Sequence, residues 1–288
     1  MLSPLLKQSI QQRLEASNLE FFIVSGGSIN KTFRIETGDR KQHFFKCNSA
    51  TKFPHLFANE VAGLKLIAAQ NVIQLPAVID VFEVENHQIL LLEWIEEGNR
   101  TPAFWKTFGE QLSALHFCTS DCFGLPTNNY MGAVPQVNTQ AADWASFFQN
   151  HRLAPLAEKC YKQGRLQPMH LEGFEKLYTR LDDIFEPSTP SLLHGDLWSA
   201  NFMCSRASEP VLIDPAVYYG HRSMDLAMTT LFGGFDTSFY KAYEYHFPFP
   251  PNYQEQWEVC NLYPLLVHLH LFGTSYLPQI QTTLSRFV

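Results

Sequence analysis

Two short apolar runs that end on reactive polar side chains constrain the fold of this chain more than any other feature. The first lies in "SLLHGDLWSANFM", residues 191–203, and leads into His194, Asp196 and Asn201. The second, in "VLIDPAVYYG", ends on Asp214. Short apolar runs of this kind are typical of buried strands. A single Asp or Asn here could simply make a turn at a strand end. All four residues in this order instead indicate a functional site.

The chain divides into a strand-rich front and a mainly helical remainder. In the front, the patterns predict an amphipathic helix, several strands, a second helix and a pair of strands joined near Glu85-Asn86, at residues 1–17, 19–47, 55–70 and 78–95. Beyond Gly98 the pattern is helical, apart from the strand-like runs at 191–193 and 211–213. We therefore expect two lobes joined near residues 93–98, with domains over 1–95 and 96–288.

Composition excludes several classes of protein. The 288 residues are 45% hydrophobic and 17% charged, which is ordinary for a globular protein with a substantial core. A net charge of −7 argues against nucleic-acid binding, and no apolar run is long enough to span a membrane. The six cysteines form no C-x-x-C pair, so we expect no zinc site, but reduced thiols in a cytoplasmic protein.

The spacing of the first motif matches a known catalytic loop. Asn201 follows Asp196 by five positions (201 − 196 = 5), as in the H-R-D-L-x-x-x-N loop of protein kinases. There the Asp receives a hydroxyl proton and the Asn binds magnesium. Such a reaction needs a carboxylate to orient the alcohol and oxygen ligands for a hard cation. Asp214 stands where the second metal-binding Asp is expected, although here Asp-Pro-Ala replaces Asp-Phe-Gly.

A second pair of charged residues lies in the front part. Lys46, in "QHFFKCN", is predicted on a strand, and Glu60 shares a helical face with Phe57, Val61 and Leu64. A carboxylate in apolar surroundings should find a cationic partner. The pattern predicts a Lys46–Glu60 ion pair of the kind that grips nucleotide phosphates in kinases. The alternative is an unpaired edge-strand Lys and a half-exposed Glu.

Longer stretches of the sequence resemble the fructosamine kinase (ketoamine kinase) family, within the aminoglycoside and choline phosphotransferase branch of the protein-kinase-like fold. The stretches that carry the resemblance cover residues 24 to 240 and are "SGGSINKTFRI", "FFKCN", "NEVAGLKLI", "LLLEWIEEG", "LHGDLWSANFM" and "IDPAVYYGHRSMDLAMTTLFGGF". The resemblance implies an α+β, two-lobed fold with a small antiparallel-sheet N-lobe and a larger, mainly helical C-lobe. It also implies ATP- and Mg²⁺-dependent phosphorylation of the third sugar carbon of a ketosamine.

Carried over residue by residue, the resemblance implies a role for each motif. Asp196 would accept the proton, while Asn201 and Asp214 would bind magnesium. The remaining nucleotide contacts would come from Lys46 oriented by Glu60, from the hinge Glu93, Trp94 and Ile95, and from the turn Gly26, Gly27 and Ser28. That turn departs from the G-x-G-x-x-G pattern of protein kinases. Because Ser28 stands where some relatives carry a Cys, redox control at this position is not expected.

Other residues have a supporting or undecided role. The resemblance places the Trp198 ring against the substrate, although a core role is the alternative. Asp225, after the candidate helix N-cap Ser223, resembles an Asp that holds the catalytic loop by hydrogen bonds. His116 and His194 are expected to support the same loop. Whether Tyr263, His268 and His270 line the acceptor pocket stays open.

We therefore predict a ketoamine kinase that acts on a small or protein-linked ketosamine. The alternatives are a kinase for an aminoglycoside, choline or another amino-alcohol, and a catalytically inactive nucleotide-binding pseudokinase. The retained polar residues argue against the inactive alternative. The preferred sugar, the preferred amine and the oligomeric state are left open.

Overall fold

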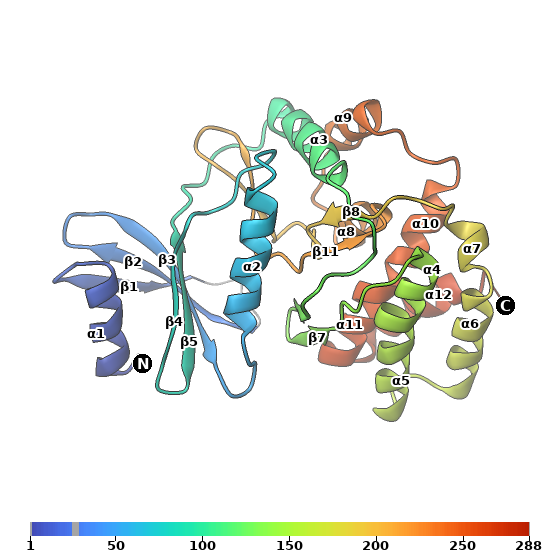
Figure 1. The fold of residues 1–288 in the computed structure, drawn as a ribbon, viewed down its shortest axis with the longest axis horizontal. Coiled ribbons are helices and arrows are strands. Elements are labelled where there is room, and N and C mark those ends of the chain that lie inside the picture. Colours follow the sequence, from blue (N-terminus) through green and yellow to red (C-terminus); the bar gives the residue numbers. More distant parts are fainter. Residues whose placement is uncertain (1, 25–28, 288) are drawn as a thin grey trace.

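The computed structural model describes residues 2–24 and 29–287. Its N-terminal lobe is built on an antiparallel sheet in the order β1-β2-β3-β5-β4. The strands are β1 Leu19–Ile23, β2 Lys31–Thr37, β3 Gln42–Ser49, β4 Val78–Val84 and β5 His87–Glu93. Two helices accompany them, α1 Pro4–Arg13 and α2 Leu56–Ala68, and Figure 1 shows these helices on opposite faces of the sheet.

Alternation along the central strands explains why both sheet faces are covered. On β5, Ile89 and Leu91 pack with α1, whereas Leu90 and Leu92 pack with α2. Successive side chains of a strand point to opposite faces, so an all-apolar strand must be buried on both sides. The strand therefore fixes two helices at once, and one of them carries Glu60.

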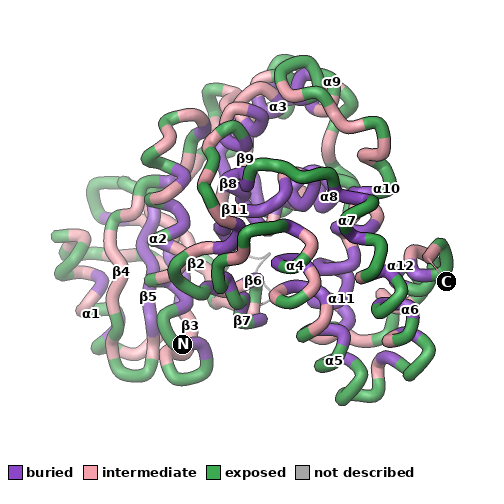
Figure 2. The backbone as a smooth tube through the Cα atoms, turned by 45° about the vertical axis from the view of Figure 1, so that its right-hand side comes forward, coloured by how far each residue is buried: buried purple, intermediate pink, exposed green. Residues whose placement is uncertain are grey.

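The C-terminal lobe is mainly helical and contains short strand pairs. Its helices are α3 Pro102–His116, α4 Trp144–Phe148, α5 Ala154–Lys162, α6 Pro168–Tyr178, α7 Leu181–Ile184, α8 Ser223–Leu231, α9 Thr237–His246, α10 Tyr253–Cys260, α11 Leu262–Phe272 and α12 Leu277–Leu284. The strand pairs are β6 Asn129–Met131 with β7 Val134–Gln136, β8 Ser191–Leu193 with β11 Tyr218–Gly220, and β9 Phe202–Cys204 with β10 Pro210–Leu212. Figure 2 shows buried backbone along α8 and α11 in the centre of this lobe.

The predicted fold class is confirmed, and the two strand-like runs at 191–193 and 211–213 correspond to β8 and β10. The first helix is shorter than predicted, because its N-cap is Ser3, whose hydroxyl accepts from the Leu6 N–H, and it ends at Arg13. The β6–β7 hairpin was not predicted. In the described part of the chain, no helix is long and apolar enough to cross a membrane.

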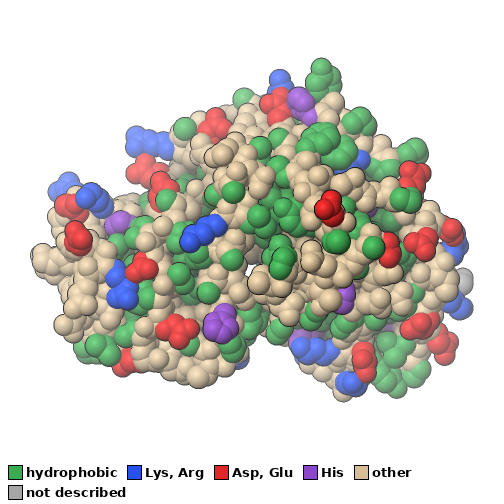
Figure 3. Space-filling view, in the orientation of Figure 1, with side chains coloured by type: hydrophobic (Ala, Val, Ile, Leu, Met, Phe, Trp, Pro, Cys, Tyr) green, Lys and Arg blue, Asp and Glu red, His purple; other side chains and the backbone are tan. Residues whose placement is uncertain are grey.

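Charged side chains are scattered on the face drawn in Figure 3. Lys and Arg side chains are dispersed over the face and interspersed with acidic ones, and apolar side chains gather near its centre. This face therefore shows no basic area of the kind that tracks a nucleic-acid backbone.

Candidate active site

The loop after β8 carries the first motif and is shaped by a glycine. Gly195 has φ +82°, and a Cβ there would lie 2.1 Å from the carbonyl oxygen of Ala216. Only glycine fits this close approach and this left-handed conformation. Gly195 thus lets the chain turn so that Asp196 reaches the site.

His194 ties this loop to the strand that precedes Asp214. Its Nδ1 accepts from the Asp196 N–H at 3.2 Å, so Nε2 carries the proton and donates to the Ile213 carbonyl at 2.9 Å. The ring is buried, and that burial lowers the pKa of His194, which favours the neutral form. His194 is therefore placed as a support of the loop.

Asp225 lies beneath the loop as a second support. Its carboxylate accepts from the N–H groups of His194 and Gly195 at 2.7 and 2.8 Å, and His116 Nε2 lies 3.2 Å away. All of these groups are buried. The prediction that Ser223 caps the helix is wrong: Ser223 is the first residue of α8, and its hydroxyl donates to Gln256.

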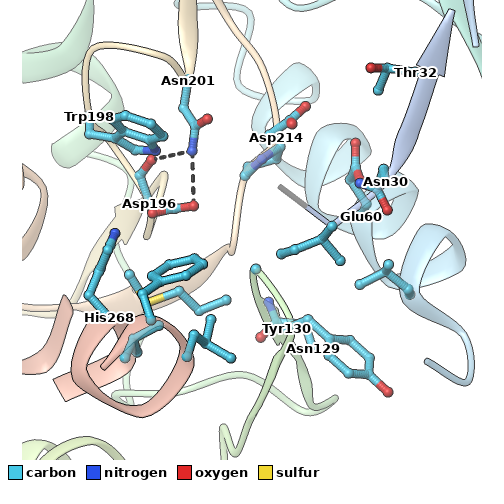
Figure 4. Close-up of a pocket in the computed structure, with 18 residues that line it drawn as sticks. Asn30, Thr32, Glu60, Asn129, Tyr130, Asp196, Trp198, Asn201, Asp214 and His268 are labelled. Carbon is cyan, nitrogen blue, oxygen red and sulfur yellow. Dashed lines mark hydrogen bonds between the residues drawn. The ribbon is translucent and has the colours of Figure 1, made fainter. Parts of the chain in front are cut away.

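The side chains of Asp196, Asn201 and Asp214, which all carry oxygen atoms, converge beside this loop. The Asn201 amide nitrogen donates to the Asp196 carboxylate at 2.9 Å and to its backbone carbonyl at 2.8 Å. Figure 4 shows the amide oxygen of Asn201 turned toward Asp214, which has a strained φ of +55°. One amide and one carboxylate oxygen suit Mg²⁺, which keeps several waters and binds substrate phosphates. No cluster of three His, Cys, Asp or Glu suited to a metal occurs among the described residues.

Lys46 completes the charge arrangement. Its buried ammonium lies 2.7 Å from Glu60 and 2.5 Å from Asp214. Burial alone would lower the pKa of Lys46, but the two carboxylates outweigh it and hold that pKa above its ordinary value. Burial also raises the pKa of Glu60 to about 6, against the lowering effect of Lys46. The predicted Lys46–Glu60 pair is present, and it extends to the expected metal ligand.

The environment of Asp196 suits a proton acceptor. Burial raises the pKa of Asp196 to about 7, the hydrogen bond from Asn201 lowers it, and the charges of Asp214 and Asp225 raise it further. A carboxylate with a pKa near neutrality is a better base than an ordinary one, and it is still ionised at slightly alkaline pH.

Two hollows meet at these residues. One is lined by the hinge residues Glu93, Trp94 and Ile95 and extends to Asn201 and Asp214. The backbone N–H of Glu93 already donates to the Ala77 carbonyl, so it is not free to donate to the base of a nucleotide. The predicted turn residues Gly26, Gly27 and Ser28 lie outside the described residues.

The second hollow contains Asp196 and is walled by side chains of several elements. Its lining includes Trp198 and, from α11, His268 and Phe272. Trp198 also packs on the core and makes an edge contact with Phe232, as the core interpretation expects, and its contact with the substrate stays a prediction. Of the three C-terminal candidates, only His268 lines this hollow.

The other two candidates point elsewhere. The Tyr263 hydroxyl donates to Gln136, and His270 contacts Gln163. Sequence reasoning also missed the β6–β7 hairpin, whose residues 129–132 line the same hollow. A Gly-containing turn between two very short apolar runs was the only signal for it.

Comparison with known proteins identifies the family. The family model described as fructosamine kinase matches residues 2–288. The chain belongs to the fructosamine kinase family. It is 37% identical over 99% of its length to a protein of Synechocystis sp. described as a probable ketoamine kinase, and it covers 97% of that protein.

Solved structures agree with this assignment. A protein from Haemophilus somnus 129PT, described as a "putative fructosamine-3-kinase", superposes with a TM-score of 0.87 at 25% identity, covering 98% of this chain and 96% of that one. An aminoglycoside-3'-phosphotransferase of type VIII superposes with a TM-score of 0.55 at 15% identity, covering 89% of this chain and 98% of that one. The second likeness shows a shared fold alone. As a member of a kinase family, the chain is a phosphotransferase that uses ATP.

Proposed function

We propose that this protein is a ketoamine kinase that transfers the γ-phosphoryl group of ATP to the C3 hydroxyl of a small or protein-linked ketosamine. The observation that carries the proposal is the half-buried Asp196, held by Asn201 in a hollow that also reaches Asp214. Residues 1–95 would form the nucleotide-binding lobe, and residues 96–288 the catalytic and substrate-binding lobe. The six free cysteines agree with a reducing compartment such as the cytoplasm.

Each polar group has a role in this reaction. Asp196 would orient the C3 hydroxyl and take its proton as the new O–P bond forms. Asn201 and Asp214 would hold Mg²⁺, which when bound neutralises charge on the phosphates. Lys46, oriented by Glu60, would contact the same phosphates, and the hinge would hold the base.

The second hollow, which contains Asp196 and is called the acceptor hollow from here on, also fits a protonated amine. Its described lining contains no Lys or Arg, and of its three acids Glu60 and Asp214 pair with Lys46, whereas Asp196 does not. Trp198 offers an aromatic face, which attracts cations. His268 donates from Nδ1 to the Pro264 carbonyl at 2.8 Å, so its Nε2 is left as an acceptor. These groups would contact the amine-linked sugar.

A comparison of acceptors tests the proposal. Purified protein with ATP and Mg²⁺ should consume ATP with ribulose-lysine or fructose-lysine, and much less with choline or an aminoglycoside. Consumption with choline or the aminoglycoside alone would instead assign an amino-alcohol kinase. The absence of any ATP turnover and of any nucleotide binding would support a pseudokinase.

A further inference from the structure

The β6–β7 hairpin lies where the two lobes and the acceptor hollow meet. Its residues Asn129, Tyr130, Met131 and Gly132 line the hollow that contains Asp196. Figure 4 shows Asn129 and Tyr130 between the helix that carries Glu60 and the helix that carries His268. By sequence the hairpin belongs to the C-terminal lobe, which begins after the hinge, yet its neighbours come from both lobes.

One side of the hairpin is bound to the N-terminal lobe. The Tyr130 hydroxyl donates to the Pro54 carbonyl at 3.0 Å, two residues before α2 begins, and the Tyr130 ring contacts the Phe53 ring edge to face. Tyr130 and Ala133 pack into the same hydrophobic cluster as α2. Since α2 carries Glu60, the hairpin holds the start of the helix that positions Lys46.

The other side of the hairpin is bound to the backbone that follows Asp214. The side-chain amide of Asn129 donates to the Val217 carbonyl at 2.8 Å, and that of Gln136 donates to the Ala216 carbonyl at 3.1 Å. Gln136 also donates to Asn129 at 2.8 Å. All of these side chains are buried. Buried, mutually satisfied amides fix one arrangement, because moving either would leave polar groups unpaired.

A buried cation makes the floor of the hairpin rigid. Arg152 is fully buried and donates to the Val137 carbonyl at 2.5 Å and to Asn138 at 2.7 Å. Its guanidinium lies 4.1 Å from the centre of the Tyr218 ring. No carboxylate of the described residues pairs with it, so the aromatic faces and the carbonyl oxygens must compensate its charge.

We propose that the hairpin couples the acceptor site to the nucleotide site, with Tyr130 and Gln136 as positioning residues. A ketosamine bound against residues 129–132 restrains the hairpin, and the hairpin restrains both α2 and the loop that carries Asp214. Acceptor and nucleotide therefore bind with positive cooperativity, which by linkage is equal in both directions. The choice of ribulose-lysine as the test ligand rests on the proposed function, and the link between the hairpin and the nucleotide site does not.

Calorimetry measures the coupling directly. The dissociation constant of the non-hydrolysable analogue AMP-PNP with Mg²⁺ is determined with and without saturating ribulose-lysine. In the natural protein, we expect saturating ribulose-lysine to lower the dissociation constant of AMP-PNP by about fivefold or more, and we call this ratio the coupling factor. Tyr130→Phe, which keeps the ring but removes the bond to Pro54, should reduce that factor to about twofold or less. Tyr263→Phe, which removes a donor to Gln136, should act in the same direction.

The coupling factor separates positioning from direct contact. If Tyr130 only touched the acceptor, Tyr130→Phe would weaken the binding of ribulose-lysine equally with and without nucleotide. The coupling factor would then stay unchanged. That result, or no tightening in the natural protein although ribulose-lysine binds, would overturn the proposal. Tyr245→Phe is the matched control, because Tyr245 is 83% exposed and should keep the full factor.

Hydrogen exchange tests the same link without any ketosamine. Binding of AMP-PNP and Mg²⁺ should slow amide exchange in residues 129–136 of the natural protein, and less so in Tyr130→Phe. Unchanged exchange there would contradict the coupling even if the protein phosphorylates ketosamines. If ribulose-lysine fails to bind while the hairpin is still protected by nucleotide, the acceptor is wrong and the coupling stands.

Discussion

At the scale of single residues, Asp196 is held in an unfavourable environment that serves its proposed role. The carboxylate is half-buried, receives one amide hydrogen bond, and lies within the influence of the charges of Asp214 and Asp225. Burial makes the ionised form costly and raises the pKa of Asp196 to about 7. The ionised form is nevertheless the one that can accept a proton.

Replacing Asp196 should separate binding from chemistry. Asp196→Asn keeps the shape of the side chain but cannot accept the hydroxyl proton, so turnover should fall by about 10² to 10⁴. Binding of AMP-PNP with Mg²⁺, measured by calorimetry, should stay within about threefold of the natural value, because the metal ligands and Lys46 remain. Asp214→Ala should instead abolish magnesium-dependent binding. Near-normal turnover in Asp196→Asn would refute the assignment of Asp196 as the proton acceptor.

The same substitution should change how stability depends on pH. The folded pKa of Asp196, about 7, lies above its unfolded value of about 4, so the folded form binds the proton more tightly. Stability from this group is therefore present below about pH 4 and is lost as pH rises through about 7. Asn has no such loss. The melting temperature of Asp196→Asn relative to the natural protein should rise between pH 5 and pH 8, and a constant difference would argue against the raised pKa.

At the scale of elements, β3 and α2 bring together two residues that are fourteen positions apart. Lys46 lies on a strand buried from both sides, and Glu60 lies on the helix that covers one of those sides. A deeply buried ammonium is stable only with such partners; removing Lys46 would leave the Glu60 charge uncompensated, whereas removing Glu60 would leave Lys46 with Asp214 as its partner. The pair is therefore more sensitive to loss of Lys46 than to loss of Glu60.

Substitution of Lys46 or Glu60 should affect the positioning of the ATP phosphates more than the binding of the adenine base. Lys46→Met should lower kcat/KM for ATP by about 10² or more, because a charged contact to the phosphates is lost. Binding of adenosine, which has no phosphate, should change much less. Glu60→Gln should give a milder form of the same defect. Equal activity in all three proteins would point to another phosphate-binding residue.

Elements with strong periodic patterns could be predicted from the sequence, and short elements held by long-range contacts could not. The burial of Phe57, Val61 and Leu64 follows directly from helical spacing. The hairpin at 129–136 has three-residue strands, and its stability depends on Gln136 and Asn129 meeting carbonyl groups some 80 residues away. Local propensity carries no trace of such contacts.

The candidate site shows the same division. Asp196, Asn201 and Asp214 lie in motifs whose spacing already indicates their chemistry, and they do converge. His268 and Tyr263 are five residues apart on one helix, yet the first faces the acceptor hollow and the second a buried amide. Which face of α11 meets the hollow depends on how the helix is rotated in the packed lobe, and no local pattern reports that.

At the scale of the whole molecule, the two lobes place the nucleotide and acceptor hollows on either side of one group of residues. Asp214 and Asn201 line both hollows, while the hinge lines only one and α11 only the other. With nucleotide and acceptor in these hollows as proposed, the shared residues would position a phosphoryl donor and an alcohol for direct transfer, and such positioning accounts for much of the catalysis in kinases. The identity of the acceptor then decides the fate of the product.

A ketosamine phosphorylated at C3 should decompose by itself. Loss of a proton from C1 gives a 1,2-enaminol, and its electron pair then expels the C3 phosphate, whereas a C3 hydroxyl is a poor leaving group. Water hydrolyses the resulting imine to the free amine and a 3-deoxy dicarbonyl sugar. After ribulose-lysine, ATP and Mg²⁺ have reacted and the enzyme has been filtered away, lysine and inorganic phosphate should appear together in equal amounts.

Matched acceptors make this last prediction decisive. Phosphocholine and aminoglycoside phosphates have no neighbouring carbonyl, so they should persist unchanged in the same filtrate. Asp196→Asn, incubated in parallel, should release neither lysine nor phosphate above the rate without enzyme. A phosphorylated ketosamine that stays intact for as long as phosphocholine would show that the phosphate is not on C3. In that case the ATP-dependent kinase activity would stand, and the position of transfer would have to be assigned to another hydroxyl of the sugar.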